Sequence, residues 1–216
     1  MDALNKLTEY FREFPGIGPR QARRFAYFLL SKSPSFSDEL ARLVVEIKKN
    51  MRVCDSCFRF YAGGRKAGPT GETSAVCAIC SDPERNHSEI MVIARDVDLE
   101  AIEKSGTYNG VYFVLGGTVP ILEKSPETRV RSRELLKKIE TAGETKKGAK
   151  PLKEIILSLS ATPEGEHTEE ILRSLLKPVA EKNDIKITML GRGLSTGAEL
   201  EYSDADTIKN ALKNRA

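Results

Sequence analysis

Apolar residues in the first fifty positions recur at intervals of three and four, which is the period of an amphipathic helix. One set runs from Leu4 to Phe14 and a second from Ala22 to Leu29. A third set, Leu40 to Ile47, follows Ser37, which we expect to cap its helix, with two acidic residues in the first turn. The pattern predicts three short helices at the start of the chain.

From Ile90 onward, apolar runs of strand length alternate with segments of helical period. Strands are predicted at 90–94, 111–115, 153–159 and 185–190, and helices at 97–104, 129–140, 167–182 and 204–214. Such alternation is typical of a parallel sheet flanked by helices. The sequence therefore predicts an α/β protein that begins with an all-α hairpin domain.

The chain has 216 residues, of which 40% are apolar and 30% charged, a balance that is ordinary for a globular protein. It contains no apolar run long enough for a membrane span, and its first residues follow a helical pattern instead of that of a signal peptide. We therefore expect a cytoplasmic protein with no membrane partner.

Positive charge is concentrated in one part of the chain. Residues 129–153 hold nine Lys or Arg and three Glu, a net charge of +6, whereas the whole chain carries only +3. Such a basic stripe can bind a polyanion. A solvated helix face followed by a Lys-rich loop explains it equally well, and both interpretations stay open.

A tight turn joins the first two predicted helices in the stretch FPGIGPRQARR, residues 14–24. Gly16 and Gly18 let the backbone turn where a Cβ would clash. Pro19 suits the first position of the next helix, and the free amides at that helix start favour an anion. The stretch has the pattern of a helix-hairpin-helix, a grip on DNA phosphates that does not depend on base sequence.

Three arginines lie directly after this turn: Arg20, Arg23 and Arg24. A plain pair of helices needs the glycines but has no need of three positive charges, so we expect contact with DNA. Arg20 and Arg24 share a helix face because they are four residues apart, whereas Arg23 partly faces elsewhere.

The four cysteines form two pairs, Cys54 with Cys57 and Cys77 with Cys80. Two such pairs separated by a loop are typical of a tetrahedral zinc site. A disulfide or a redox pair is the alternative, but cytosolic disulfides are rare. Four sulfur ligands leave no open position for a substrate, so we expect one structural Zn²⁺ per chain.

An acidic pair, Glu164 and Glu166, stands at the carboxyl end of the predicted strand 153–159, just after Pro163. Parallel sheets place ligand chemistry at such strand ends. The pair belongs either to a functional active site or to a site of the same fold that has lost its catalytic residues.

In this order, the pieces resemble the bacterial RecR family of recombination mediators. The resemblance rests on FPGIGPRQARRFAYFLL, on the finger ending CAICSDPER, on IEKSGTYNGVYFVLGG with ATPEGEHTE, and on the tail GRGLSTGAELEYSDADTIKNAL. It implies four parts, of which the third has the Toprim fold that topoisomerases and primases share. The parts are a helix-hairpin-helix domain at 1–51, a four-cysteine zinc finger at 52–87, the Toprim domain at 88–190 and a C-terminal segment at 191–216.

The resemblance also implies a function. Members of the family are non-catalytic DNA-binding proteins of recombinational repair, which act with RecO and RecF to load recombinase on gapped DNA. They assemble into a ring-like homo-oligomer, for which we expect a tetramer. The protein is then expected to bind duplex, gapped or single-stranded DNA.

The resemblance to Toprim proteins helps to decide whether Glu164 and Glu166 are catalytic. Toprim enzymes hold Mg²⁺ with several carboxylates, and three of the positions concerned fall here on Ala94, Ser160 and Thr162. Only Glu164 and Glu166 remain; Asp96 and Asp98 lie close by, but we do not expect them to compensate. We therefore expect no catalytic residue and assign the two glutamates to a partner contact.

The sequence departs from the family pattern in two places, and two other functions stay open. The loop around residues 62–75 is longer than usual, and the segment 115–131 differs from the usual sequence, so we derive no partner contact from it. A Mg²⁺-dependent nuclease or primase-like Toprim enzyme is the first alternative. An RNA-binding zinc-ribbon protein is the second, because a hairpin grips either nucleic acid through its phosphates.

Overall fold

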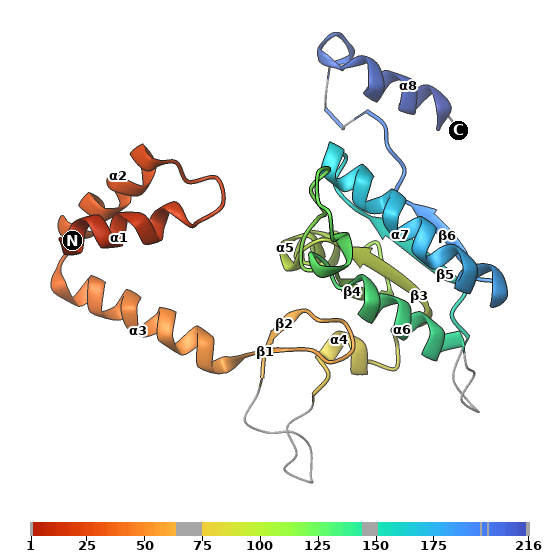
Figure 1. Ribbon diagram of the computed structural model, residues 1–216, viewed down its shortest axis with the longest axis horizontal. Helices are drawn as coiled ribbons and strands as arrows, with labels where there is room; N and C mark the ends of the chain where they lie inside the picture. The colour runs from red at the N-terminus through yellow and green to blue at the C-terminus, as the bar shows by residue number, and fades with distance from the viewer. Residues whose placement is uncertain (1, 64–74, 144–150, 195, 198, 215–216) are drawn as a thin grey trace. The chain divides into compact units, whose positions relative to one another are not determined.

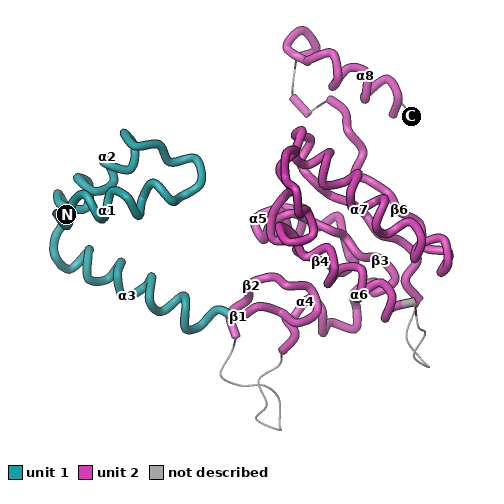
Figure 2. Tube along the Cα trace, in the orientation of Figure 1, with its two compact units in different colours: residues 1–51 teal, residues 52–216 magenta. Residues whose placement is uncertain are grey.

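The structure is a computed structural model that describes residues 2–63, 75–143, 151–194, 196–197 and 199–214. The chain forms two compact units, residues 1–51 and residues 52–216, shown in teal and magenta in Figure 2. Most of the long finger loop and the part of the basic stripe at 144–150 lie outside the described residues. The division into four parts, which is finer than these units, stays a prediction.

The first unit consists of three helices, α1 (Ala3–Arg12), α2 (Pro19–Leu30) and α3 (Pro34–Asn50), labelled in Figure 1. Helices α1 and α2 pack together through small and aromatic residues. Ala22 and Ala26 of α2 are fully buried, and the ring of Phe25 meets that of Phe11 edge-on at 5.9 Å. The three predicted helices are therefore present.

Helix α3 begins four residues before its predicted start. Ser33 is its cap and accepts a hydrogen bond from the backbone N–H of Phe36, so the expected cap at Ser37 is wrong. The reason is Pro34, whose fixed φ and missing N–H suit the first helical position. The acidic residues after Ser37 consequently lie in the second turn.

The second unit is built on four parallel strands in the order β4-β3-β5-β6. They are β3 (Asn86–Ile93), β4 (Gly110–Val114), β5 (Glu154–Ser158) and β6 (Lys186–Met189). The apolar runs of the sequence thus form the sheet that they predict. The chain runs from β3 to β4 on one side and returns to β5 on the other, so the strand order reverses between β3 and β5.

Helices cover both faces of this sheet, as Figure 1 shows. Helices α6 (Ser132–Gly143) and α7 (Pro163–Lys182) bury Leu135 and Leu172 against one face, where Phe113 contributes from β4. Helix α5 (Asp96–Ser105) buries Leu99 against Met91 on the other. The prediction of an α/β fold with a parallel sheet is confirmed.

Two of these helices differ from their predicted limits. Helix α7 starts at Pro163 instead of 167, because Thr162 caps it and accepts from the N–H of Gly165. Helix α6 starts at Ser132 instead of 129, after a short 3-10 turn, η1 (Pro126–Thr128). Proline at the first helical position explains the earlier start of α7, as it does in α3.

The cysteine-rich segment folds into β1 (Met51–Val53), β2 (Phe60–Ala62) and the single turn α4 (Ala78–Ser81). After β6 the chain forms a 3-10 turn, η2 (Leu200–Tyr202), and α8 (Ala205–Lys213), which buries no residue. Among the described helices, none combines the length and the apolar character that crossing a membrane requires.

Candidate metal centre and nucleic-acid interface

The four cysteines converge from two turns of the finger. Cys54 and Cys57 lie in the turn between β1 and β2, and Cys77 and Cys80 lie at the start and inside of α4. Their four sulfur atoms all lie within 4.8 Å of one another, and all four thiols are free. The predicted cluster is therefore present in the structure.

The geometry suits a tetrahedral metal ion. A Zn²⁺ with four thiolates at about 2.3 Å sets its sulfurs about 3.8 Å apart, and the Sγ atoms of Cys57 and Cys77 are 3.7 Å apart. The Cys77 pKa lies well below its usual range because Cys57 donates to its sulfur, and the same bond raises the pKa of Cys57. The site thus stabilises a thiolate, the form of cysteine that binds metal.

Phe58, directly after the first cysteine pair, holds the finger against the sheet. Its backbone has φ +63°, a left-handed conformation that is uncommon for a bulky side chain. Its ring packs on Phe113 of β4 with centroids 5.3 Å apart, and the guanidinium of Arg131 lies 5.4 Å from its centroid. This packing offsets the cost of the strained backbone.

Further hydrogen bonds join the finger to the sheet and its helices. The carbonyl of Cys57 accepts from the N–H of Val114 at 2.8 Å. The finger thus pairs with the outer edge of β4, the first strand of the sheet. The ammonium group of Lys138 in α6 donates to the backbone carbonyl and the hydroxyl of Ser56, at 2.8 and 2.7 Å. A metal in the finger would therefore also support the sheet edge.

The turn between α1 and α2 has the geometry of a helix-hairpin-helix. Gly16 has φ +78°, which favours glycine, whereas Gly18 is extended at φ −81° and caps α2. Pro19 is the first residue of α2, and the N–H of Ala22 closes the first helical bond to Gly18 at 3.0 Å. The N–H of Ile17 donates to the carbonyl of Phe14 at 3.1 Å, whereas the first N–H groups of α2 have no partner within the helix and can meet an anion.

All three arginines of α2 are exposed to solvent. Arg24 donates to the side chain of Gln21 at 3.3 Å. In the described part of the chain, the side chains of Arg20 and Arg23 have no hydrogen bond or ion pair. This region therefore presents positive charge that is not neutralised within its own unit.

The carboxyl ends of β3 and β5 lie side by side where the strand order reverses, and three positions there, Ala94, Ser160 and Thr162, carry no charge. Ala94 is buried, and Ser160 is exposed after β5. The carbonyl of Ser160 lies so close to Gly165 that a Cβ there would come within 2.0 Å of it, so only glycine fits. Thr162 is used as the helix cap. Three positions that carry carboxylates in Toprim enzymes thus hold none here.

The two nearby aspartates are already engaged. Asp96 accepts from the backbone N–H of Phe60 in β2 at 2.7 Å, which is a further link to the finger. Asp98 accepts from the N–H of Arg95 at 2.9 Å at the start of α5. Among the described residues, only the four cysteines form a group of three or more Cys, His, Asp or Glu side chains placed to share a metal ion, so neither aspartate completes a set with Glu164 and Glu166.

Three family models match this chain, and together they leave residues 49–87 unmatched. The model described as "RecR, helix-hairpin-helix" matches residues 4–48, "Toprim domain" matches 88–191, and "RecR, C-terminal" matches 193–216. Recombination protein RecR of Carboxydothermus hydrogenoformans is 36% identical over 215 residues, which cover 99% of this chain and 96% of that protein. The chain belongs to the RecR family.

Other RecR proteins match it to a similar extent. The protein of Bifidobacterium adolescentis is 34% identical over 99% of this chain and 95% of its own length. That of Chloroflexus aurantiacus is 32% identical over 97% of this chain and 92% of its own length. The resemblance to the RecR family that the sequence indicates is therefore confirmed.

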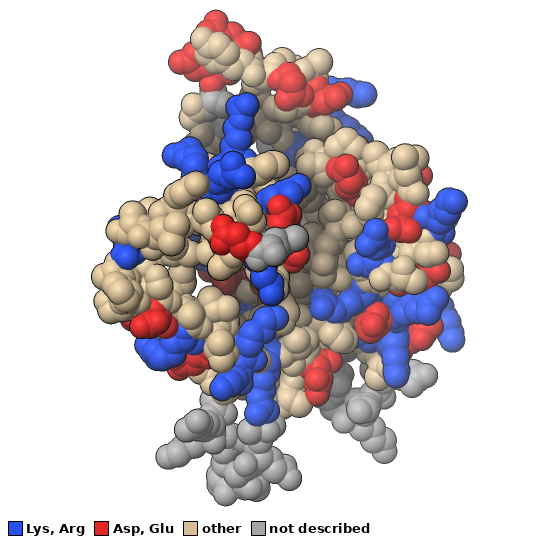
Figure 3. Space-filling model, turned by 60° about the vertical axis from the view of Figure 1, so that its left-hand side comes forward, with Lys and Arg blue, Asp and Glu red and all other residues tan. Residues whose placement is uncertain are grey.

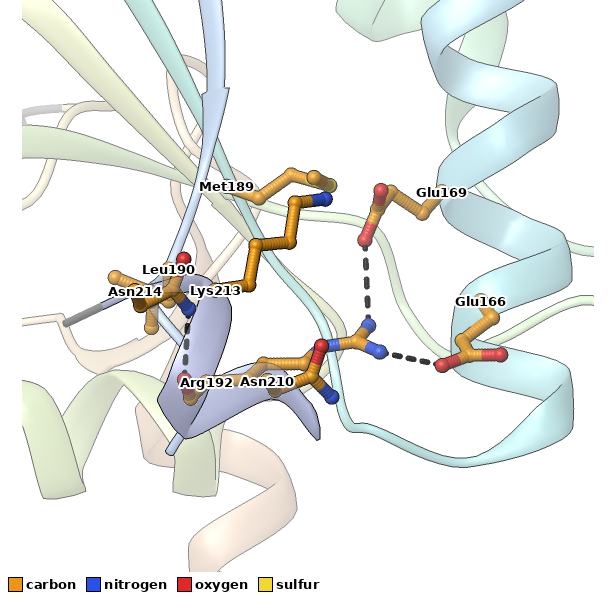
Figure 4. Close-up of a pocket in the computed structure, with 9 residues that line it drawn as sticks. Glu166, Glu169, Met189, Leu190, Arg192, Asn210, Lys213 and Asn214 are labelled. Carbon is orange, nitrogen blue, oxygen red and sulfur yellow. Dashed lines mark hydrogen bonds and ion pairs between the residues drawn. The ribbon is translucent and has the colours of Figure 1, made fainter. Parts of the chain in front are cut away.

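In this RecR-family chain the two glutamates at the start of α7 differ in their surroundings. Glu166 is paired with the guanidinium of Arg192, whose other nitrogen lies 3.7 Å from Glu169 (Figure 4). Glu164 is exposed and has no side-chain hydrogen bond or ion pair within the described residues. Arg192 was not among the residues expected to form this site.

Arg192 lies at the edge of a pocket of about 390 Å³ between α7, the end of β6 and α8. Its carbonyl accepts from the side chain of Asn214, and Lys213 also lines the pocket (Figure 4). Both charge signs meet here, so the pocket is not a preformed site for a cation.

The described part of the basic stripe is mostly used inside the second unit. Arg129 pairs with Glu123 at 2.5 Å, Arg131 donates to the carbonyl of Val114 at 3.0 Å, and Lys138 holds the finger. On the face shown in Figure 3, basic and acidic side chains are interspersed. For the residues of the stripe that the structure describes, these contacts favour a solvated, internally paired surface over a continuous polyanion site.

Proposed function

We propose that this protein is a non-catalytic DNA-binding mediator of recombinational repair. The observation that carries this proposal is the hairpin of α1 and α2, with three exposed arginines after its turn, in a chain that matches RecR proteins over nearly its full length. Its relatives are named recombination proteins. Contact with DNA is made through phosphates by Gly16, Gly18, Arg20, Arg23 and Arg24.

The free amides at the start of α2 and the arginines contact the same partner in different ways. Backbone N–H groups at a helix start bind one phosphate, and the guanidinium groups that follow add charge-assisted hydrogen bonds to its neighbours. Such contacts position a protein on nucleic acid without reading its bases. This suits a protein that must act at any gap in the genome.

Partner proteins and self-assembly complete the proposal. Acting with RecO and RecF, the protein loads recombinase on gapped DNA as a ring-like homo-oligomer, with a tetramer as the expected size. Helix α3 supports self-assembly because none of its residues is buried within the chain, while Leu43, Val44 and Ile47 are about half exposed, at 48%, 58% and 58%. Contiguous exposed apolar residues of this kind mark protein contacts.

The metal is Zn²⁺, held by Cys54, Cys57, Cys77 and Cys80, and its role is structural. Four thiolates fill the tetrahedral shell, so no position is left for substrate. The contacts from Phe58 and Ser56 to β4 and α6 make the finger a brace for the sheet edge.

Glu164 and Glu166 contribute to partner binding, and no residue is catalytic. Support comes from Ala94, Ser160 and Thr162, which leave the strand ends without the carboxylates that bind Mg²⁺. The side chain of Glu164 has no partner within the described residues, whereas Glu166 is paired with Arg192. Glu164 is therefore the better candidate for an intermolecular contact.

The test is a double variant, Arg20→Ala with Arg24→Ala. We expect weaker binding to every DNA sequence, and the slope of log affinity against log salt should fall by about 0.9 for each duplex phosphate that the variant no longer neutralises. Lys48→Ala with Lys49→Ala removes the same charge from the last turn of α3 and serves as the matched control.

Three results would overturn the proposal. Unchanged affinity and slope in the arginine variant would exclude the hairpin as the DNA contact. Cleavage or extension of DNA by the purified protein with Mg²⁺ or Mn²⁺ would make it an enzyme. Preference for RNA over duplex and gapped DNA in competition would instead favour the RNA-binding alternative.

A further inference from the structure

Tyr27 lies among the three arginines of α2. It is seven residues after Arg20, four after Arg23 and three after Arg24, and residues at these intervals share one face of a helix. The buried alanines of α2, Ala22 and Ala26, lie on another side. The basic face of the hairpin therefore carries an aromatic ring.

This ring differs from the other aromatic rings of α2. Phe25 packs edge-on against Phe11, and Phe28 packs against Phe36 and lies under the ammonium group of Lys32 at 4.5 Å. Tyr27 is 55% exposed, and its side chain has no ring contact, cation contact or hydrogen bond within the described residues. Packing within this unit does not explain its position.

A ring in a row of arginines has a defined chemistry toward nucleic acid. Single strands bind where basic groups follow the backbone and aromatic rings stack on the bases. A duplex offers phosphates to the arginines, but its bases are already stacked on one another. Only a strand with unpaired bases can use both parts of this face.

The spacing along the helix suits such a strand. Arg20 and Tyr27 are separated by about 10 Å along the axis of α2, at about 1.5 Å for each residue. A single strand that passes along this face can therefore place phosphates beside the arginines and a base on the ring of Tyr27.

We propose that Tyr27 stacks on an unpaired DNA base next to the phosphates that Arg20 and Arg24 hold, and so gives the hairpin a preference for single-stranded over duplex DNA. This inference rests on the proposed DNA contact of the hairpin and adds a residue that distinguishes the two forms of DNA. The ligand is any base with a free face, because stacking tolerates all four.

The first experiment compares Tyr27→Ala and Tyr27→Phe on a mixed-sequence single strand and on the blunt duplex of the same sequence. Tyr27→Ala should bind the single strand about tenfold more weakly, within the range for the loss of one stacked base, and the duplex as before. Tyr27→Phe keeps the ring and should behave like the unchanged protein. Equal loss on both DNAs, or loss on neither, would overturn the proposal.

A second measurement reads the stacking directly. The chain has no tryptophan, so Tyr27→Trp introduces a single fluorophore on this face. Its fluorescence should be quenched by the single strand and much less by the duplex. Tyr202→Trp is the matched control, because Tyr202 is 81% exposed and lies outside the hairpin beside acidic residues. Equal quenching of both fluorophores would contradict the proposal.

The arginine double variant separates this inference from the proposed function. Loss of binding to both DNAs in Arg20→Ala with Arg24→Ala, without any effect of Tyr27→Ala, would leave the DNA contact standing and reject the stacking. If neither variant changes binding, both proposals fail. A change in the mass of Tyr27→Ala in solution would assign the ring to self-association and would also reject the stacking.

Discussion

Arg192 and Glu166 form an ion pair that connects the segment after β6 to the first turn of α7. The guanidinium also approaches Glu169, and the backbone carbonyl of Arg192 accepts from Asn214 at the end of α8. One residue thus contacts both the start of α7 and the C-terminal helix. Helix α8 buries none of its own residues, so its position depends on few contacts of this kind.

Arg192→Ala should loosen the C-terminal segment without unfolding the sheet. A partly exposed ion pair contributes about 0–1 kcal/mol, so the overall stability should change little, while amide hydrogen exchange in residues 199–213 should become faster. Arg173→Ala removes the other arginine next to Glu169, which lies within α7 at 3.6 Å, and is the control. Equal exchange in both variants would show that Arg192 does not hold α8.

Metal analysis should find one Zn²⁺ per chain, and Cys77→Ser should release it. Zinc in such sites contributes on the order of 10 kcal/mol of apparent binding energy to the folded form. The variant should lose protease resistance in the finger and also near β4, because Cys57 and Phe58 contact that strand. Ser81→Ala, on the same turn of α4, keeps four thiolates and should retain the metal. Metal-free protein that is fully folded would contradict this prediction.

The sheet and the cysteine cluster could be predicted because their signals are local. Buried parallel strands are continuous apolar runs, and β4 and β5 lie within one residue of their predicted ends. The short elements β1, β2 and α4 have too few residues to show a period. The predicted starts of α3 and α7 are too late, because a proline can open a helix as well as break one.

Contacts between distant residues could not be predicted from one sequence. Asp96 and Phe60 are 36 residues apart, and Arg192 and Glu166 are 26 apart. Neither pair leaves a periodic pattern, since each depends on how separate elements pack. The sequence places Asp96 close to a strand end, but only the structure shows that its carboxylate joins the finger.

Glu103 in α5 should make the second unit sensitive to acid. Hydrogen bonds from Arg85, at 2.9 and 2.5 Å, and from the hydroxyl of Tyr112, at 2.6 Å, hold the pKa of this carboxyl below its usual range. A lowered carboxyl pKa stabilises the fold above the unfolded value of about 4.3 and loses this effect as the pH falls through the folded value.

Glu103→Gln should therefore lower the free energy of unfolding near neutral pH and weaken its dependence on pH below about 5. Urea denaturation at several pH values measures this. Glu100→Gln, an exposed residue of the same helix, is the control and should follow the unchanged protein. Acid also weakens metal binding in the finger, but that loss is common to both variants. Parallel curves for the two variants would exclude Glu103 as the sensitive group.

Replacing Glu164 and Glu166 by Gln should leave DNA affinity unchanged or higher and abolish no chemistry. Acidic residues in the first turn of a helix contribute about 0.3–1 kcal/mol through the helix dipole, so a modest loss of stability is expected. The single variants should differ, because Glu166 is engaged by Arg192 and Glu164 is free within the described structure.

Binding to RecO, measured beside a nuclease assay with Mg²⁺, distinguishes the possible roles of these glutamates. Glu164→Gln should weaken the partner contact more than Glu166→Gln, because an exposed carboxylate without an internal partner is available to a basic group on another protein. Glu170→Gln, an exposed carboxylate later in α7, controls for loss of negative charge alone. Loss of metal-dependent DNA cleavage in the double variant, with partner binding intact, would instead make the carboxyl ends of β3 and β5 an active site.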